Sequence, residues 1–205
     1  MRDSFFRKLK YRQPGVIGEQ EAVKFAVALP IMYENDEPVL LFQVRSSKMR
    51  RQPGDICFPG GKIETEDLTS VEAAARELSE ETGIPRSKAA HISSLDRWLT
   101  PYGIVVYPHV FLIDPTPLAP NDEVEELFTV PIADLLKQAP ERIPIPLRPE
   151  PPEDFPYERI AGGRNYPFRT AKLPELFYEH EGRHIWGLTA RILEHFLEVL
   201  NEKDE

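Results

Sequence analysis

Apolar residues alternate with polar ones in the early part of the chain. Within residues 21–33 every second side chain is apolar over four positions, and residues 38–45 form a second apolar run. The ENDE segment between the two runs is rich in residues that favour turns. This pattern predicts two β-strands joined by a tight connection.

Residues 70–82 change to a helical period. Apolar or small side chains recur there at spacings of three and four residues, which predicts a helix with one buried stripe. The stripe consists of Val71, Ala74, Ala75, Leu78 and Thr82. Because Gly83 and Pro85 follow directly, we expect the helix to end at this point.

The rest of the chain predicts further strands and two more helices. Strands are expected near residues 91–99, 104–113, 124–130 and 176–180, and helices from Pro131 and from Trp186. Residues 139–156 are crowded with prolines, which exclude a central strand or a regular helix. Strands and helices without regular alternation predict an α/β (α+β) fold. We expect a single domain over residues 1–205, with a short N-terminal arm (1–20) and a proline-rich loop excursion (about 139–170).

Composition narrows the possible functions. The chain has 25 basic and 34 acidic residues, and its net charge of −9 gives no footprint for nonspecific nucleic-acid binding. No apolar run reaches the length of a membrane span. Cys57 is the only cysteine, which excludes an intramolecular disulfide and a thiolate metal cluster. We therefore expect a cytoplasmic protein whose partners include neither a nucleic acid nor a membrane.

Three glutamates gather on one face of the predicted helix. Glu77, Glu80 and Glu81 lie at positions i, i+3 and i+4, where like charges cost about 0.2–0.5 kcal/mol per pair. Mg²⁺ or Mn²⁺ would relieve this repulsion, because both ions favour oxygen ligands. A solvated glutamate-rich surface is the alternative explanation. Two neighbouring features favour the cation: the pair Gly60–Gly61 permits close backbone approach to a ligand or metal, and Arg76 can orient carboxylates.

At these residues the sequence shows a family resemblance. The segment GGKIETEDLTSVEAAARELSEETGI resembles the Nudix box, whose usual pattern is G-x5-E-x7-R-E-U-x-E-E-x-G-U, with U aliphatic. The matching residues are Gly61, Arg76, Glu77, Leu78, Glu80, Glu81, Gly83 and Ile84. The interval from Gly61 to Arg76 is one residue longer than usual, and Asp67 replaces the internal glutamate. The resemblance implies the Nudix fold, a mixed β-sheet sandwiched between helices.

The preceding segment, LLFQVRSSKMRRQPGDICFPGG, resembles the signature of the coenzyme A diphosphatase branch of Nudix hydrolases. The matching residues are Arg45, Ser46, Arg50, Gly54, Phe58, Pro59, Gly60 and Gly61. Gln52 departs from the signature, because that branch usually has histidine there, whereas the lengthened box is typical of it. This resemblance implies metal-dependent hydrolysis of coenzyme A or its derivatives to 3′,5′-ADP and (acyl-)4′-phosphopantetheine, by attack of a metal-activated water.

The resemblance also implies roles for single residues. The ligands of one to three Mg²⁺ or Mn²⁺ ions would be Gly61, Glu77, Glu80 and Glu81. Arg76 would orient the glutamates, and the general base would be Glu81 or Glu123, with Glu125 less favoured. The residues that bind the substrate would be Arg45, Ser46, Arg50 and Gly60.

Several alternatives stay open. The Nudix box alone does not separate coenzyme A from ADP-ribose, NADH, a nucleoside triphosphate or a capped RNA end. A Nudix-fold binding module without catalysis is a different class, although it would be expected to have a damaged box. Cys57 is interpreted as a small apolar side chain and His109 as a packing or surface residue. A homodimer is the default expectation for the oligomeric state.

Overall fold

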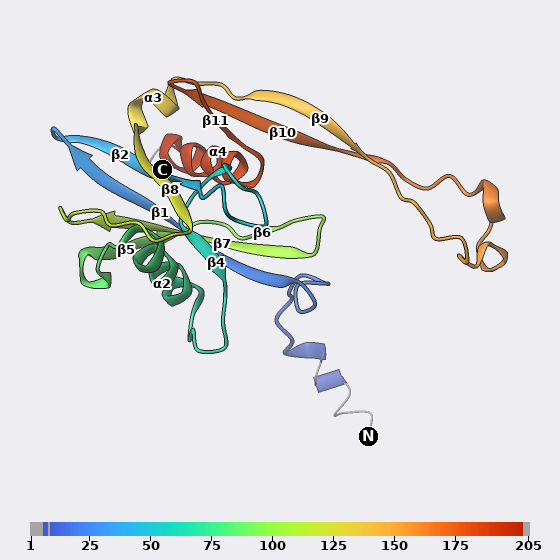
Figure 1. Ribbon diagram of the computed structural model, residues 1–205. Helices are drawn as coiled ribbons and strands as arrows, with labels where there is room; N and C mark the ends of the chain where they lie inside the picture. The colour runs from blue at the N-terminus through green and yellow to red at the C-terminus, as the bar shows by residue number, and fades with distance from the viewer. Residues whose placement is uncertain (1–5, 8, 203–205) are drawn as a thin grey trace. The chain divides into compact units, whose positions relative to one another are not determined.

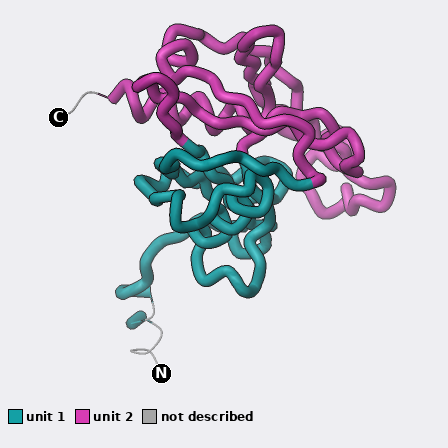
Figure 2. The backbone as a smooth tube through the Cα atoms, turned by 60° about the vertical axis from the view of Figure 1, so that its left-hand side comes forward, with its two compact units in different colours: residues 1–30, 59–121 teal, residues 31–58, 122–205 magenta. Residues whose placement is uncertain are grey.

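The computed structural model describes residues 6–7 and 9–202, and its contacts divide the chain into two compact units (Figures 1 and 2). The first unit contains the chain up to Pro30 together with Pro59–Asn121, and the second contains Ile31–Phe58 together with the chain from Asp122 onward. Strand β1 (Val23–Glu34) contributes residues to both units. The expectation of one domain over residues 1–205 remains a prediction.

The first unit packs one helix on a group of strands. Its elements after β1 are β4 (Gly60–Lys62), α2 (Ser70–Thr82), the 3-10 turn η1 (Arg86–Lys88), β5 (Ala89–Ser94), β6 (Trp98–Leu99) and β7 (Ile104–Ile113). Strand β4 runs antiparallel to β1, with Gly61 opposite Ala26, and β5 and β6 both run antiparallel to β7. Because α2 contacts β4, β5 and β7, its inner face is buried on these strands.

Helix α2 has the bounds that the sequence predicts. The side chain of Thr69 accepts a hydrogen bond from the backbone N–H of Glu72, and Gly83 ends the helix in the left-handed conformation with φ 76°. The buried residues are Ala73, Ala74, Leu78, Glu81 and Thr82. The predicted stripe is therefore wrong at Val71 and Ala75, which are only half-buried. The buried face is turned toward Ala73 and Glu81 instead.

The second unit contains two groups of strands. The first group is the end of β1 with β2 (Glu37–Arg45), β3 (Ile56–Cys57) and β8 (Val124–Pro131), followed by α3 (Ile132–Leu136). The second is β9 (Glu141–Leu147), β10 (Ala171–His180) and β11 (Arg183–Trp186), followed by α4 (Gly187–Asn201). Strand β2 pairs antiparallel with β1, β3 and β8, and α4 contacts β10 and β11. Asn35 and Asp36 turn the β1–β2 hairpin with φ 51° and 66°.

The proline-rich segment differs from the expectation of a loop. Residues 141–147 form strand β9, which pairs antiparallel with β10 and brings Pro144 opposite Pro174. Because β9 lies at the edge of its three-stranded sheet, its prolines interrupt no ladder on the outer side. The excursion therefore begins only after Leu147, and residues 148–170 close the far end of the β9–β10 ribbon (Figure 1).

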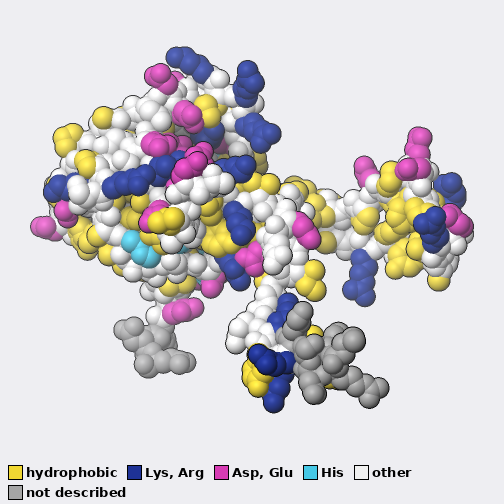
Figure 3. Space-filling model, turned by 90° about the horizontal axis from the view of Figure 1, so that it is seen from below, with side chains coloured by type: hydrophobic (Ala, Val, Ile, Leu, Met, Phe, Trp, Pro, Cys, Tyr) yellow, Lys and Arg dark blue, Asp and Glu magenta, His cyan; other side chains and the backbone are white. Residues whose placement is uncertain are grey.

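Aromatic side chains gather at that far end, together with the 3-10 turns η2 (Tyr157–Arg159) and η3 (Gly163–Asn165). The ring of Phe155 lies 5.0 Å from Tyr157 and 5.8 Å from Phe168, edge to face. Figure 3 shows the resulting apolar cluster at the right, surrounded by basic and acidic side chains.

The strand that the sequence predicts near residues 176–180 is too short, since β10 begins at Ala171. The sequence also misses β11, whose last residue is Trp186.

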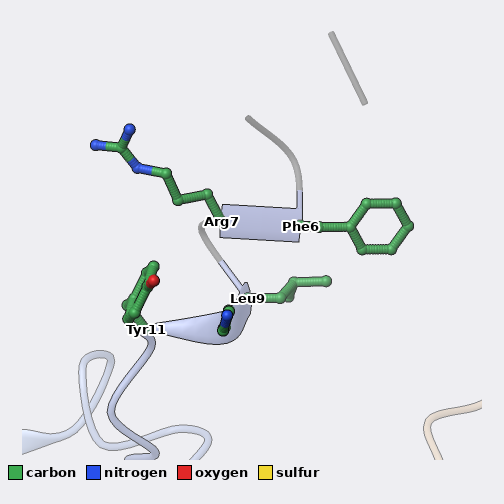
Figure 4. A pocket seen from close by; sticks show the side chains of 5 residues that line it. Phe6, Arg7, Leu9 and Tyr11 are labelled. Carbon is green, nitrogen blue, oxygen red and sulfur yellow. The ribbon is translucent and has the colours of Figure 1, made fainter. Parts of the chain in front are cut away.

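The N-terminal arm is described from Phe6, whereas residues 1–5 and 8 lie outside the described part. Phe6 and Leu9 point to one side, and Arg7 points away from them (Figure 4). With Lys10 and Tyr11 they line an open pocket of about 600 Å³. Among the described residues, no helix is long and apolar enough to cross a membrane.

Candidate active site on helix α2

The three glutamates of α2 face different surroundings. Glu81 is buried, with 3% exposure, and its Oε2 accepts a hydrogen bond of 2.8 Å from the backbone N–H of Gly60. Glu77 is half-buried, and the side chain of Glu80 is 56% exposed. Glu77 and Glu81 are four residues apart, so they share the side of the helix that faces β4. The helix therefore places two carboxylates against a backbone strand and leaves the third toward solvent.

Gly60 and Gly61 are required for different reasons. A Cβ on Gly60 would lie 2.6 Å from the carbonyl oxygen of Ala26, because β4 packs closely on β1. A Cβ on Gly61 would lie 2.3 Å from Oε1 of Glu77. The close approach of a ligand or metal expected at this glycine pair remains a prediction, and within the protein the group closest to Gly61 is the carboxylate of Glu77.

Arg76 holds the acidic side chains around it. Its Nε and Nη2 donate to the two oxygens of Asp67 at 3.1 and 3.0 Å, and its Nη1 donates to Glu77 at 2.7 Å and to Glu80 at 3.4 Å. Nη2 also donates to the carbonyl of Lys62 in β4 at 3.3 Å. The fork of the guanidinium makes this set of contacts possible.

These contacts also change the acid–base properties of the pair. The hydrogen bond from Arg76 lowers the pKa of Asp67, and the same bond raises the pKa of Arg76 above its ordinary value. Sequence reasoning noted Asp67 only as a departure from the motif and missed its role as the bidentate partner. The available signal was an acidic residue nine positions before Arg76, within reach once the intervening chain folds back.

The carboxylates do not converge on one point. In the part of the chain that the structure describes, no three His, Cys, Asp or Glu side chains are arranged to hold a metal ion. The predicted three-glutamate cluster is divided, because Arg76 draws Glu77 and Glu80 to itself while Glu81 accepts the amide of Gly60. The donor chemistry still fits a divalent cation, since carboxylates and a glycine carbonyl are hard oxygen ligands and Gly61 leaves room beside Glu77.

Of the residues predicted to bind substrate, Arg45, Ser46 and Arg50 belong to the second unit, whereas Gly60 belongs to the first. The backbone N–H of Arg45 donates to the carbonyl of Asp55 at 2.9 Å, and the backbone N–H of buried Ser46 donates to the carbonyl of Glu123 at 2.7 Å. The loop after β2 is thereby tied to the start of β8. Arg50 is exposed, as is Glu123.

Glu125, the less favoured base, is committed to this same loop. Its Oε2 accepts hydrogen bonds of 3.0 Å from both the backbone N–H and the hydroxyl of Ser47. These bonds lower the pKa of Glu125, which makes the carboxylate a weaker base. The lowered pKa is a physical reason for the low place of Glu125 among the candidates, and the identity of the base remains a prediction.

His109 is a packing residue, as predicted. It is 3% exposed on β7, with Nδ1 2.9 Å from the hydroxyl of Ser94 and Nε2 3.0 Å from the hydroxyl of Ser70. Burial lowers the pKa of His109 to about 4, and repulsion from His91 adds to the effect. His109 therefore connects β5, β7 and the first residue of α2 as a neutral side chain. Cys57 is half-buried, as its interpretation as an apolar residue requires.

Comparison with known proteins decides the family. Residues 23–148 match the family model of the NUDIX domain, which covers more than half of the chain. The chain belongs to the Nudix family. This confirms the resemblance of the box and identifies α2 as its helix.

Curated relatives of this Nudix chain carry the names of coenzyme A diphosphatases. It is 33% identical over 181 residues to the mitochondrial coenzyme A diphosphatase NUDT8 of Homo sapiens, covering 85% of this chain and 68% of that protein. It is 38% identical over 111 residues to the peroxisomal coenzyme A diphosphatase NUDT7 of Mus musculus, covering 53% and 47%. The aligned region thus spans about half of the mouse relative.

Among solved structures, a MutT/nudix family protein from Enterococcus faecalis aligns with a TM-score of 0.49 at 16% identity, covering 98% of this chain and 70% of that one. The family-model match and the two named relatives, not this structural alignment, confirm the predicted family, its branch and the assignment to the Nudix hydrolases. The strands and helices of the structure confirm the mixed α/β fold.

Proposed function

We propose that this Nudix hydrolase cleaves the diphosphate bond of coenzyme A or its acylated derivatives, which yields 3′,5′-ADP and (acyl-)4′-phosphopantetheine. The observation that carries the proposal is the contact of α2 with the glycine pair, where Glu81 accepts the amide of Gly60 and Glu77 abuts Gly61. The match between residues 40–61 and the coenzyme A branch supports the choice of substrate, as do the names of the two relatives.

The reaction needs a divalent cation, as is general in the Nudix family. Glu77, Glu80, Glu81 and the carbonyl of Gly61 would hold Mg²⁺ or Mn²⁺, all through oxygen atoms. When bound, such an ion offsets the charge of the diphosphate and lowers the pKa of a water molecule. Arg76 would hold Glu77 in position through a hydrogen bond from Nη1, because the same guanidinium is also hydrogen-bonded to Asp67 and to the backbone carbonyl of Lys62 in β4.

A carboxylate must accept the proton of the attacking water. Glu81 and Glu123 are the candidates, and both retain this role in our proposal. Gly60 restrains one oxygen of Glu81, so the orientation of that carboxylate is set before substrate arrives. Glu123 lies at the start of the strand that follows its loop, and its backbone carbonyl accepts from Ser46.

Recognition of the substrate phosphates is assigned to Arg45, Ser46, Arg50 and Gly60. Arg45 is half-buried at the end of β2, and its Nε has no acceptor among the described residues. A buried donor without an acceptor is costly, and an anionic oxygen of the substrate would satisfy it. Exposed Arg50 adds positive charge to the same loop.

A hydrolysis panel tests the proposal. Purified protein is incubated with Mg²⁺ or Mn²⁺ and coenzyme A, acetyl-coenzyme A, ADP-ribose or NADH, and the products are separated by chromatography. We expect the highest kcat/KM for one of the two coenzyme A substrates, with 3′,5′-ADP as a product. A clear preference for ADP-ribose or NADH would reject the substrate assignment. Binding of coenzyme A without turnover under all conditions would indicate the binding module instead.

Two further expectations are tested separately. We propose a homodimer, which sedimentation measures directly, and a cytoplasmic location, which fractionation of source cells measures.

A further inference from the structure

Trp186 presents an aromatic ring to solvent at the end of β11. The side chain is 42% exposed, although tryptophan is the largest apolar residue. Its ring stacks on that of Phe177, its direct partner across the β10–β11 ladder, with 6.0 Å between centroids and 6° between planes. One neighbour therefore holds the indole flat, while much of its surface remains open.

The edge of the indole lies near Asp55, because β11 contacts β3, which begins directly after that residue. A hydrogen bond from Trp186 reaches the carboxylate of Asp55. Burial raises the pKa of Asp55, and the charge of Arg45 together with this hydrogen bond opposes that effect. The backbone of Asp55 is bonded to Arg45, because its carbonyl accepts the Arg45 N–H at 2.9 Å. Asp55 thus connects an exposed aromatic plane with an arginine that has an unsatisfied Nε.

An aromatic plane beside a cationic donor matches the two chemically distinct parts of a nucleotide. Every nucleobase has a π face that stacks on an aromatic side chain, and this stacking is worth about 5- to 150-fold in affinity. An arginine fork binds phosphate oxygens through charge-assisted hydrogen bonds. Both groups lie next to Asp55, whose main-chain carbonyl accepts the backbone N–H of Arg45 and whose carboxylate interacts with the indole.

We propose that Trp186 is the platform on which the adenine base of the substrate stacks, while Arg45 contacts a phosphate of the same nucleotide. The inference rests on the proposed function for the identity of the nucleotide, and it adds a binding residue that neither the Nudix box nor the residue 40–61 signature contains. The pantetheine arm of the substrate would make no contact with the indole.

Tryptophan fluorescence provides a direct test, because the chain has only Trp98 and Trp186. In a Trp98→Phe background the emission reports Trp186 alone. With EDTA present, so that no turnover occurs, the protein is titrated with adenosine 3′,5′-bisphosphate and separately with 4′-phosphopantetheine. We expect saturable quenching by the adenine nucleotide and none by 4′-phosphopantetheine. Equal response to both ligands, or no response to the nucleotide, would overturn the proposal.

Substitutions separate stacking from a structural role. Trp186→Phe keeps an aromatic face and is expected to weaken binding of adenosine 3′,5′-bisphosphate less than threefold by calorimetry. Trp186→Leu is expected to weaken it by about 10-fold or more. In coenzyme A hydrolysis the leucine variant should raise KM by a similar factor and change kcat less than threefold. An equal effect of both substitutions, or a lower kcat at unchanged KM, would show that Trp186 only supports the fold.

The two proposals fail in different ways. If coenzyme A is not hydrolysed but Trp186 is still quenched by adenosine 3′,5′-bisphosphate, the reaction is wrong and the adenine platform stands. If coenzyme A is hydrolysed and Trp186→Leu has an unchanged KM, the reaction stands and the platform is wrong. Melting temperatures of Trp186→Phe and Trp186→Leu control for loss of folded protein.

Discussion

Helices α2 and α4 each bury a glutamate, but the partners of the two carboxylates differ in kind. Glu81 of α2 accepts the backbone N–H of Gly60, whereas Glu194 of α4 accepts from the guanidinium groups of Arg142 and Arg191. An amide orients a carboxylate without cancelling its charge, and two guanidinium groups cancel it. Under the proposed function, Glu81 would take part in the chemistry, whereas Glu194 stabilises the contact of α4 with Arg142 of β9.

The largest expected effect comes from removing the charge of the buried glutamate on each helix. Glu81→Gln keeps an acceptor for the amide of Gly60 but removes the charge, so we expect kcat to fall roughly 1,000-fold with an unchanged melting temperature. Glu194→Gln should do the opposite, because it leaves two guanidinium groups without their counterion. We expect it to lower the free energy of unfolding by about 1–3 kcal/mol and to leave kcat unchanged. A loss of activity in Glu194→Gln, or normal activity in Glu81→Gln, would erase the distinction.

Acid should weaken the packing of α2 on β5 and β7, because the neutral side chain of His109, and no ion pair of His109 with a described residue, connects these three elements. Its pKa in the folded state, about 4, lies below the ordinary value of 6.5. The unfolded chain therefore binds more protons between these two pH values, and the stability due to a neutral His109 is lost as pH falls through this window. The free energy of unfolding should drop by up to about 3 kcal/mol between pH 7 and pH 4.

Denaturant titrations at several pH values measure this loss. His109→Gln should flatten the pH dependence, whereas the same change at exposed His184 should leave it as in the natural chain. Equal slopes for the two variants would show that His109 is not the group that titrates.

A methyl group at Gly61 tests the contact between β4 and α2. The Cβ of Gly61→Ala would lie 2.3 Å from Oε1 of Glu77, so the carboxylate must move. A displacement of this size is expected to lower kcat/KM by roughly 10- to 100-fold. Gly15→Ala is the matched control, because a Cβ there meets nothing within 4 Å. Full activity in Gly61→Ala would show that the position of Glu77 is unimportant.

The smallest expected effect comes from replacing one arginine on each of the two helices, α2 and α4, with lysine. Arg76→Lys cannot reach both oxygens of Asp67 and Glu77 together, so we expect kcat to fall by about 10-fold. Arg191→Lys loses a comparable fork between Glu194 and the carbonyl of Pro174, and it should leave kcat unchanged. Steady-state kinetics at saturating Mg²⁺ compares the two. Equal losses would mean that the effect comes from general destabilisation.

The parts of the fold predicted well are those decided by neighbours in sequence. Helix α2 begins after Thr69 and ends at Gly83 because capping depends on residues only three or four positions apart. Strand β9 was missed, since its prolines are unfavourable in a strand until an edge position beside β10 removes the need for their missing N–H groups. Its stability depends on a partner about 30 residues later in the chain.

The sequence by itself determined the family, the bounds of α2 and the presence of three glutamates beside a glycine pair, because all of these are local patterns. Only the tertiary structure decided how those glutamates differ. The pairing of β4 with β1 brings the amide of Gly60 to Glu81, and Asp67 folds back to hold Arg76. These contacts join residues that are 21 and 9 positions apart in the sequence, respectively. The burial and the hydrogen-bond partner of each glutamate could therefore not be predicted from the helical spacing that places the three charges on one helix.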